Sequence, residues 1–239
     1  MTPILLLSQV FVLFLFLCSI DSGAADEFIS SARLDNLCMS FCSLEALLST
    51  LASLGTDSLI RVVTLFDHEE VGSDSAQGAG SNMMHTLFTR ISGADRVHSA
   101  IRKSMLVSAD MAHACHPNYP EKHEANHRPR MHEGLVFKFN AKQRYATDAV
   151  SSFILKEIAR CRKVPVQHFC VRNDVGCGST IGPILASNTG IRVIDVGVPQ
   201  FAMHSIRELC AVDDVAHAVD LLAGFFEDFA SIDNNLKVD

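Results

Sequence analysis

Five side chains with the chemistry of metal ligands follow apolar, strand-like runs of this sequence. Asp35 stands in ARLDNL, Glu69 and Glu70 in LFDHEEVGS, Asp110 in VSADMAH and His204 in FAMHSIRE. In open α/β sheets, functional groups gather outside the carboxyl ends of the strands. Carboxylates and an imidazole are ligands suited to Zn²⁺ or a similar divalent ion. The pattern therefore predicts a metallohydrolase.

The adjacent glutamates, Glu69 and Glu70, suggest two different roles, metal ligand and general base. Two neighbouring carboxylates repel each other unless something neutralises them, and a metal ion does so. One glutamate then binds the ion, and the other faces a metal-bound water as general base. Alone, the pair is more typical of a solvated acidic turn, Asp35 and Asp110 of helix caps, and His204 of a structural histidine. The prediction depends on all four segments together.

Two other motifs suggest competing functions. His123–His127 (HEANH) matches the zincin pattern H-E-x-x-H, which works only on a continuous helix. Pro120 and Pro129 flank it, so we expect that helix not to form. Residues 175–182 (VGCGSTIG) miss the dinucleotide fingerprint and the P-loop, and they predict tight helix–strand packing instead. The sequence lacks the G-x-S-x-G motif, which disfavours a serine hydrolase.

Composition narrows the class of protein. The 239 residues suffice for one large domain or two small ones, and a hydrophobic content of 48% supports a real core. A net charge of −7 without a long basic run disfavours nucleic-acid binding. The eight cysteines form no CxxC pair and lie mostly in apolar stretches, so we expect reduced thiols.

Apolar patterns of strand and helix type alternate along the chain, which predicts a layered α/β domain. Residues 27–34 are expected to be extended, and residues 111–133 to form a long loop. Strands are expected at residues 59–66, 104–109, 135–139, 166–171 and 191–196. Helices are expected at residues 36–53, 76–91, 147–160, 182–190 and 212–229.

Several long motifs, in order, resemble one known family. They are RLDNL, FDHEEVGSDSAQGAGS, SADMAHACHPNYPEKHEANHRP, KQRYATDA, RNDVGCGSTIGP and PQFAMHSIRE. Together they resemble aspartyl aminopeptidases of the M18 family of metallopeptidases, from residue 23 to residue 239. The resemblance implies a layered α/β/α zinc-exopeptidase-like domain with a mixed sheet. It also implies a dinuclear-zinc enzyme that removes an N-terminal Asp or Glu from peptides.

The same resemblance implies roles for the candidate metal ligands. Asp35 is similar to the carboxylate that bridges two zinc ions. Glu70 and His204 resemble the remaining ligands of one ion, and Asp110 resembles a ligand of the other. Glu69 resembles the catalytic general base.

Substrate contacts are implied in the same way. His113, Lys138 and Tyr145 match positions that contact substrate, as do Glu69 and Asp110. A cationic Lys138 would suit an acidic substrate side chain. The resemblance therefore implies peptide substrates with an acidic N-terminus.

The chain also departs from the family pattern. Family members carry an upstream HxD motif, whose histidine completes the second zinc site, and a smaller inserted domain; neither precedes Asp35. We therefore interpret residues 23–239 as the C-terminal portion of a catalytic domain with one complete and one incomplete zinc site. A competing hypothesis is an inactive fragment that binds at most one metal ion.

Residues 1–22 form an apolar N-terminal segment, which we interpret as a non-native start. Residues 3–20 also resemble a secretory signal, though without a basic n-region, and reach the lower limit of a membrane span. The family resemblance implies a cytoplasmic or vacuolar protein, and the segment, if genuine, a secretory or membrane protein. Family members are homo-oligomers, but the part that builds those contacts is not found here.

Overall fold

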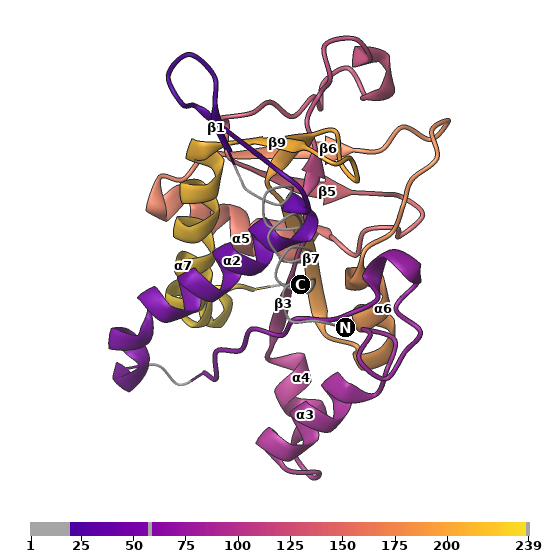
Figure 1. Cartoon of the computed structure of the whole chain (residues 1–239). Helices are drawn as coiled ribbons and strands as arrows, with labels where there is room; N and C mark the ends of the chain where they lie inside the picture. The colour runs from indigo at the N-terminus through magenta and orange to yellow at the C-terminus, as the bar shows by residue number, and fades with distance from the viewer. Residues whose placement is uncertain (1–19, 57–58, 238–239) are drawn as a thin grey trace, which may run out of the picture.

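The computed structural model describes residues 20–56 and 59–237 (Figure 1). Its strands form two sheets. The first has the order β1 (Ile20–Ser22), β2 (Phe28–Ser31), β9 (Glu208–Ala211), β8 (Pro199–Phe201) and β4 (Ala112–His113). The second has the order β3 (Met105–Ala109), β7 (Arg192–Gly197), β5 (Leu135–Phe139) and β6 (Val166–Cys170). Both sheets are mixed: β8–β4, β3–β7 and β5–β6 pair in parallel, and the other pairs are antiparallel.

The two sheets join where β3 leads into β4 and β7 leads into β8. β3 and β7 pair as far as Ala109 and Val196, and β4 continues in the same register with β8. Across the joint, the N–H groups of Asp110 and Ala112 donate to the carbonyls of Val196 and Val198. Asp110 therefore lies at a fixed point between two paired segments.

Helices cover both faces of the β3–β7–β5–β6 sheet (Figure 1). On one face lie α2 (Leu34–Ser49), α5 (Ala149–Arg162) and α7 (Val212–Asn235). On the other lie α3 (Met83–Ser92), α4 (Val97–Arg102) and α6 (Ile181–Thr189).

Strand β7 shows how the two helical layers share the sheet. Its Ile194 and Val196 pack into the core of the first layer, and Val193 packs beside Ile101 in the second. Successive side chains of a strand point to opposite faces, so a strand covered by helices on both faces buries apolar side chains on both. The predicted layered α/β/α domain is confirmed.

The prediction of a strand at residues 59–66 is wrong. These residues lie outside any strand, and Ile60, Val62 and Leu65 are exposed. A β-branched run becomes a strand only where a neighbour pairs with its backbone, and no strand in the described part of the chain does so. The other expected strands and helices are present; the largest differences are that α3 begins at Met83 and not at residue 76, and that α7 ends at Asn235 and not at residue 229.

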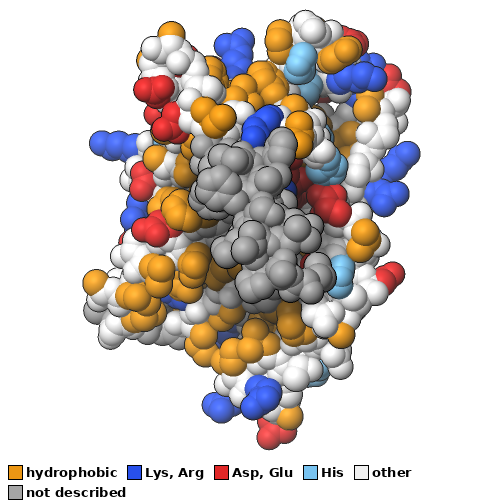
Figure 2. Space-filling model, viewed as in Figure 1, with side chains coloured by type: hydrophobic (Ala, Val, Ile, Leu, Met, Phe, Trp, Pro, Cys, Tyr) orange, Lys and Arg blue, Asp and Glu red, His pale blue; other side chains and the backbone are white. Residues whose placement is uncertain are grey.

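Helix α2 has hydrophobic side chains on both its buried and its exposed side. One side buries Leu34, Met39 and Cys42 against α7 and the sheet. The opposite side exposes hydrophobic side chains, which gather over α2 in Figure 2: Leu37, Phe41, Leu44 and Leu48. Their spacing of three or four residues places them on one stripe of the helix surface.

The cysteines described in the structure, from Cys38 to Cys210, are free thiols, as the sequence predicts. None of the helices within residues 20–56 and 59–237 combines the length and the hydropathy that a membrane crossing requires. The apolar segment of residues 3–20 lies outside the described residues except for Ile20.

The core assignment can be tested at Phe137, which is fully buried in β5. Phe137→Ala should lower the free energy of unfolding by about 3–5 kcal/mol, because it removes a large side chain that its neighbours cannot replace. Phe153 of α5 is 50% exposed, so Phe153→Ala is the matched control and should change stability little. Urea denaturation measures both. Equal losses would contradict the packing described here.

Candidate metal centre

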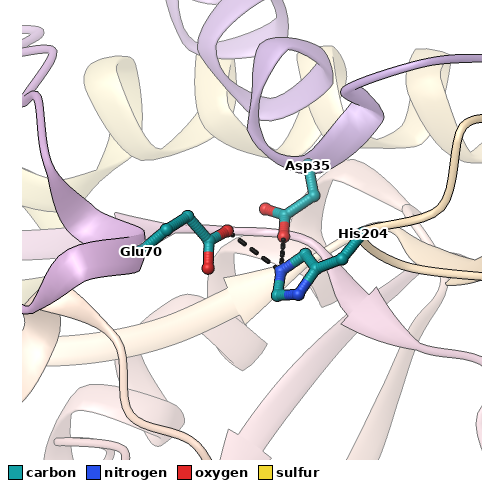
Figure 3. A group of neighbouring side chains, drawn as sticks. All are labelled: Asp35, Glu70 and His204. Atoms are coloured by element: carbon teal, nitrogen blue, oxygen red, sulfur yellow. Dashed lines mark hydrogen bonds and ion pairs between the residues drawn. The ribbon is translucent and has the colours of Figure 1, made fainter.

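Asp35, Glu70 and His204 meet although they come from distant parts of the chain (Figure 3). Nε2 of His204 lies 2.9 Å from Oδ2 of Asp35 and 3.0 Å from Oε1 of Glu70. One ligand atom from each residue lies within 4.8 Å of the other two. Asp35 is almost fully buried, with 5% of its side chain exposed, whereas Glu70 and His204 are open to solvent.

Asp35 reaches the site because the backbone at the start of α2 is irregular. Asp35 and Asn36 have non-helical angles, and the regular helix follows them. The Asn36 side chain donates from Nδ2 to the Ala109 carbonyl at 2.9 Å. This bond fixes the start of α2 against the end of β3, so Asp35 lies beside the joint between the two sheets.

A tight loop presents Glu69 and Glu70. The two residues begin a short 3₁₀ turn, Glu69–Val71, and the loop closes through a 2.8 Å hydrogen bond from Ser73 N to the His68 carbonyl. A Cβ at Gly78 would lie 2.1 Å from the Ser73 carbonyl oxygen, so only glycine fits there. The sequence SAQGAGS thus packs the loop closely behind the glutamate pair.

The acidic side chains of this site raise one another's pKa. Burial, then the Asp110 carboxyl hydrogen-bonded to it, and then Glu70 raise the pKa of Asp35 to about 9. Burial, followed by Asp110 and Glu70, raises the pKa of Glu69 to about 7. Carboxyl groups this close favour a partner of opposite charge.

Lys138 lies on β5 and provides one such charge. Its Nζ is 3.1 Å from Oδ2 of Asp110 and donates to the Met111 carbonyl at 2.7 Å. Lys138 is 2% exposed, and its Nζ lies 5.4 Å from the centre of the Tyr145 ring. Asp110 is thus next to Asp35 but outside the group of three ligands, and Lys138 contacts it directly.

The three grouped ligands fit a catalytic zinc ion. Such sites use three protein ligands of the His and Asp/Glu type and leave one position open for water or substrate. The described residues gather one set of this kind, Asp35, Glu70 and His204. Asp110 lies close by without joining the set, so the predicted second ion has an incomplete set of ligands in this part of the chain.

A cavity of about 440 Å³ is lined by His113 and Tyr145, two of the predicted substrate-contacting residues. The other lining residues are Ala114, His116, Tyr119, Lys122, His123, Phe169, Val171, Val175, Gly176, Cys177 and Gly178. No carboxylate is among these described lining residues, and Nδ1 of the buried His123 has no hydrogen-bond partner there. The cavity therefore offers donors and basic groups to a ligand.

The remaining motifs have structural explanations. His123–His127 follows a single 3₁₀ turn (Pro120–Lys122) and is not helical, so the helix that a zincin needs is absent. In the glycine-rich turn, a Cβ at Gly182 would meet the Asp195 carboxylate at 2.4 Å. Asp195 also accepts a hydrogen bond from Thr180, the N-cap of α6. This is the tight helix–strand packing that the sequence predicts.

The sequence alone did not single out two supporting residues, Asn36 and Glu208. Asn36 follows a predicted ligand directly, and Glu208 is a charged residue at the start of an apolar run, ELCAV. Both are defined by hydrogen bonds to segments far away in sequence, for which the sequence carries no local signal.

Comparison with known proteins agrees with the family resemblance of the sequence motifs. Residues 11–226 match the family model described as Aminopeptidase I zinc metalloprotease (M18). A probable aspartyl aminopeptidase of Ricinus communis is 61% identical over 229 residues, covering 92% of this chain and 47% of the relative. Aspartyl aminopeptidase 1 of Schizosaccharomyces pombe is 47% identical, with coverage of 91% and 47%. The chain thus spans about half the length of these relatives.

Solved structures show the same likeness. The cryo-EM structure of the Ape4 and Nbr1 complex contains a chain that is 46% identical, with a TM-score of 0.89, over 92% of this chain and 43% of that one. The S. cerevisiae mApe1 dodecamer is 32% identical, with a TM-score of 0.80, over 90% and 49%. The fold described above therefore corresponds to about half of each solved chain.

The ligand assignment can be tested by comparing two possible zinc sites. Glu70→Ala should weaken zinc binding by more than about 100-fold, the upper end for losing a group that only supports a ligand. His123→Ala should leave the affinity unchanged, because His123 belongs to no ligand group in the described residues. Competition with a chromophoric chelator measures both. Loss of zinc in His123→Ala with none in Glu70→Ala would establish the HEANH segment as the site.

Proposed function

Because this chain belongs to the M18 family of zinc metallopeptidases, we propose that it is the metal-binding part of an aminopeptidase that removes N-terminal Asp or Glu from peptides. The observation that carries the proposal is the meeting of Asp35, Glu70 and His204 beside Glu69. The names of the relatives, aspartyl aminopeptidases, support the acidic substrate.

Each residue near the centre has a distinct task in this proposal. Asp35, Glu70 and His204 would hold Zn²⁺, which supplies Lewis-acid activation of the scissile carbonyl and of water when bound. Glu69 accepts a proton from the attacking water at its carboxylate and passes it to the leaving amine. Glu69 is half-buried next to Glu70, which places its carboxylate beside the proposed ion.

The cavity beside the centre accounts for substrate choice in this proposal. His113 and Tyr145 line it, and its described lining contains histidines and Lys122 but no carboxylate. An acidic side chain entering the cavity would meet N–H and O–H donors without like-charge repulsion. Lys138 lies behind Tyr145 and adds a fixed positive charge nearby.

One observation favours a second candidate function, cation binding without turnover. The described residues gather one group of three ligands, Asp35, Glu70 and His204, enough for a single ion. Metal content per chain and hydrolysis of a peptide with N-terminal Asp separate the two functions. Turnover supports the aminopeptidase, and one bound ion without turnover supports the second candidate.

The general base is tested by Glu69→Gln. The amide cannot take up the proton of water, so kcat should fall by roughly 10²–10⁴-fold. Zinc content should stay at the wild-type value, because Glu69 is outside the ligand group. The exposed Glu121→Gln variant serves as control and should retain activity. Full activity of Glu69→Gln would remove Glu69 from the mechanism.

Substrate selection is tested by His113→Ala. Loss of a hydrogen bond to a charged substrate group, roughly 1.5 kcal/mol, should raise KM for an Asp-peptide about tenfold. KM for a peptide with N-terminal Ala should change less, because it lacks the carboxylate. His85 lies on the exposed surface of α3, so His85→Ala is the control. An equal rise in KM for both peptides would contradict this role of His113.

A further inference from the structure

Glu208, the first residue of β9, is a buried carboxylate that holds two parts of the metal centre together. It is 1% exposed. Its Oε2 accepts the backbone N–H of Asp35 at 2.9 Å, and its Oε1 accepts the backbone N–H of His204 at 2.6 Å. Each oxygen thus binds the main chain of a different ligand.

We propose that Glu208 is a positioning residue that sets the geometry of the cation site without contacting the cation. This inference rests on the proposed function, since it concerns the same three ligands. Asp35 and His204 are 169 positions apart in the sequence. Glu208 is the group that ties both of their backbones to one rigid strand.

The backbone of His204 shows why such a restraint matters. His204 has a φ of +67°, in the left-handed region that residues other than glycine rarely occupy. Ala202, two residues earlier, has a φ of +57°. Such conformations persist only where the surroundings hold them. The short bond from His204 N to Glu208 holds this turn, and thereby directs the imidazole toward Asp35 and Glu70.

Asp35 depends on Glu208 for a related reason. Asp35 lies in the first turn of α2, where the backbone N–H groups have no carbonyl of the same helix to bond. A buried N–H without a partner is unfavourable. The Glu208 carboxylate meets this need and fixes the backbone from which the Asp35 side chain extends.

A carboxylate is the suitable group because it offers two equivalent acceptor oxygens and a charge that strengthens both bonds. Glutamine at this position has one acceptor oxygen, and its amino group would face a second N–H donor. Glu208→Gln should therefore release the backbone of Asp35 or of His204 while nearly preserving the side-chain volume.

The fold provides a matched control in Asp214 of α7. It is fully buried, and its two oxygens accept the N–H groups of His132 and Gly134, each at 2.7 Å. None of the ligand residues is among the hydrogen-bond partners described for it. Asp214→Asn removes the same kind of support at a distance from the cation site.

The test compares cation affinity and stability in the full chain. Affinities for Zn²⁺ and Co²⁺ are measured by chelator competition, and the thermal midpoint is measured without metal. Glu208→Gln should weaken both affinities about 10–100-fold, the range for losing a group that orients a ligand. It should also alter the visible absorption of bound Co²⁺. Asp214→Asn should keep the affinity within about twofold of wild type even if its thermal midpoint falls equally.

The outcomes separate the inference from the proposed function. An affinity loss in Glu208→Gln no larger than that in Asp214→Asn, with an unchanged Co²⁺ spectrum, overturns the inference alone. A wild-type chain that binds neither ion overturns the proposed function as well. If Glu208→Gln does not fold, Glu208→Asp keeps both oxygens and the charge but is one methylene shorter. It should then show the weakened affinity and the altered spectrum, and wild-type values would overturn the inference.

Discussion

Mutual repulsion among carboxylates is the constraint on which the rest of this structure depends. Asp35, Glu69, Glu70 and Asp110 gather at one place, and burial and proximity raise the pKa of Asp35 and Glu69. Such a cluster is stable only if positive or hydrogen-donating groups meet it. His204, Lys138 and the backbone supply part of this compensation, and a divalent cation would supply the remainder. The fold must therefore hold acidic groups where they would otherwise separate.

The sheet joint provides the rigidity that this requires. The carbonyl of Asp110 lies so close to β7 that a Cβ at Gly197 would come within 1.8 Å of it. Glycine at that position lets the end of β3 approach the end of β7, where the two sheets meet. With helices packed on both faces of β7, neither strand can move without disturbing the core. Asp110, and Asp35 through its neighbour Asn36, are thus held at the joint between the two sheets.

The sequence predicted the layers and the main site residues because both depend on local signals. Apolar periodicity marked the strands β3, β5, β6 and β7, and ligand chemistry after apolar runs marked Asp35, Glu70 and His204. Strands β1, β8 and β9 have three or four residues each, too few for a periodic pattern. The run at residues 59–66 has strand composition, but none of the strands in the described part of the chain pairs with it, and strand pairing cannot be inferred from composition. Glu208 acts through bonds to Asp35 and His204, which exist only after folding.

The contact between Lys138 and Asp110 shows how one residue could serve both predicted purposes, metal binding and substrate binding. A carboxylate has two oxygens with about four lone-pair positions, and Lys138 contacts only Oδ2 of Asp110 in this structure. The Asp110 carboxyl is also hydrogen-bonded to the carboxyl of Asp35. Because Lys138 is buried and also donates to the Met111 carbonyl, its charge stays in place whether or not Asp110 gains a further partner. A fixed ammonium group would then lower the repulsion that an acidic substrate meets on approaching the carboxylate cluster, which links the stability of the site to its proposed choice of substrate.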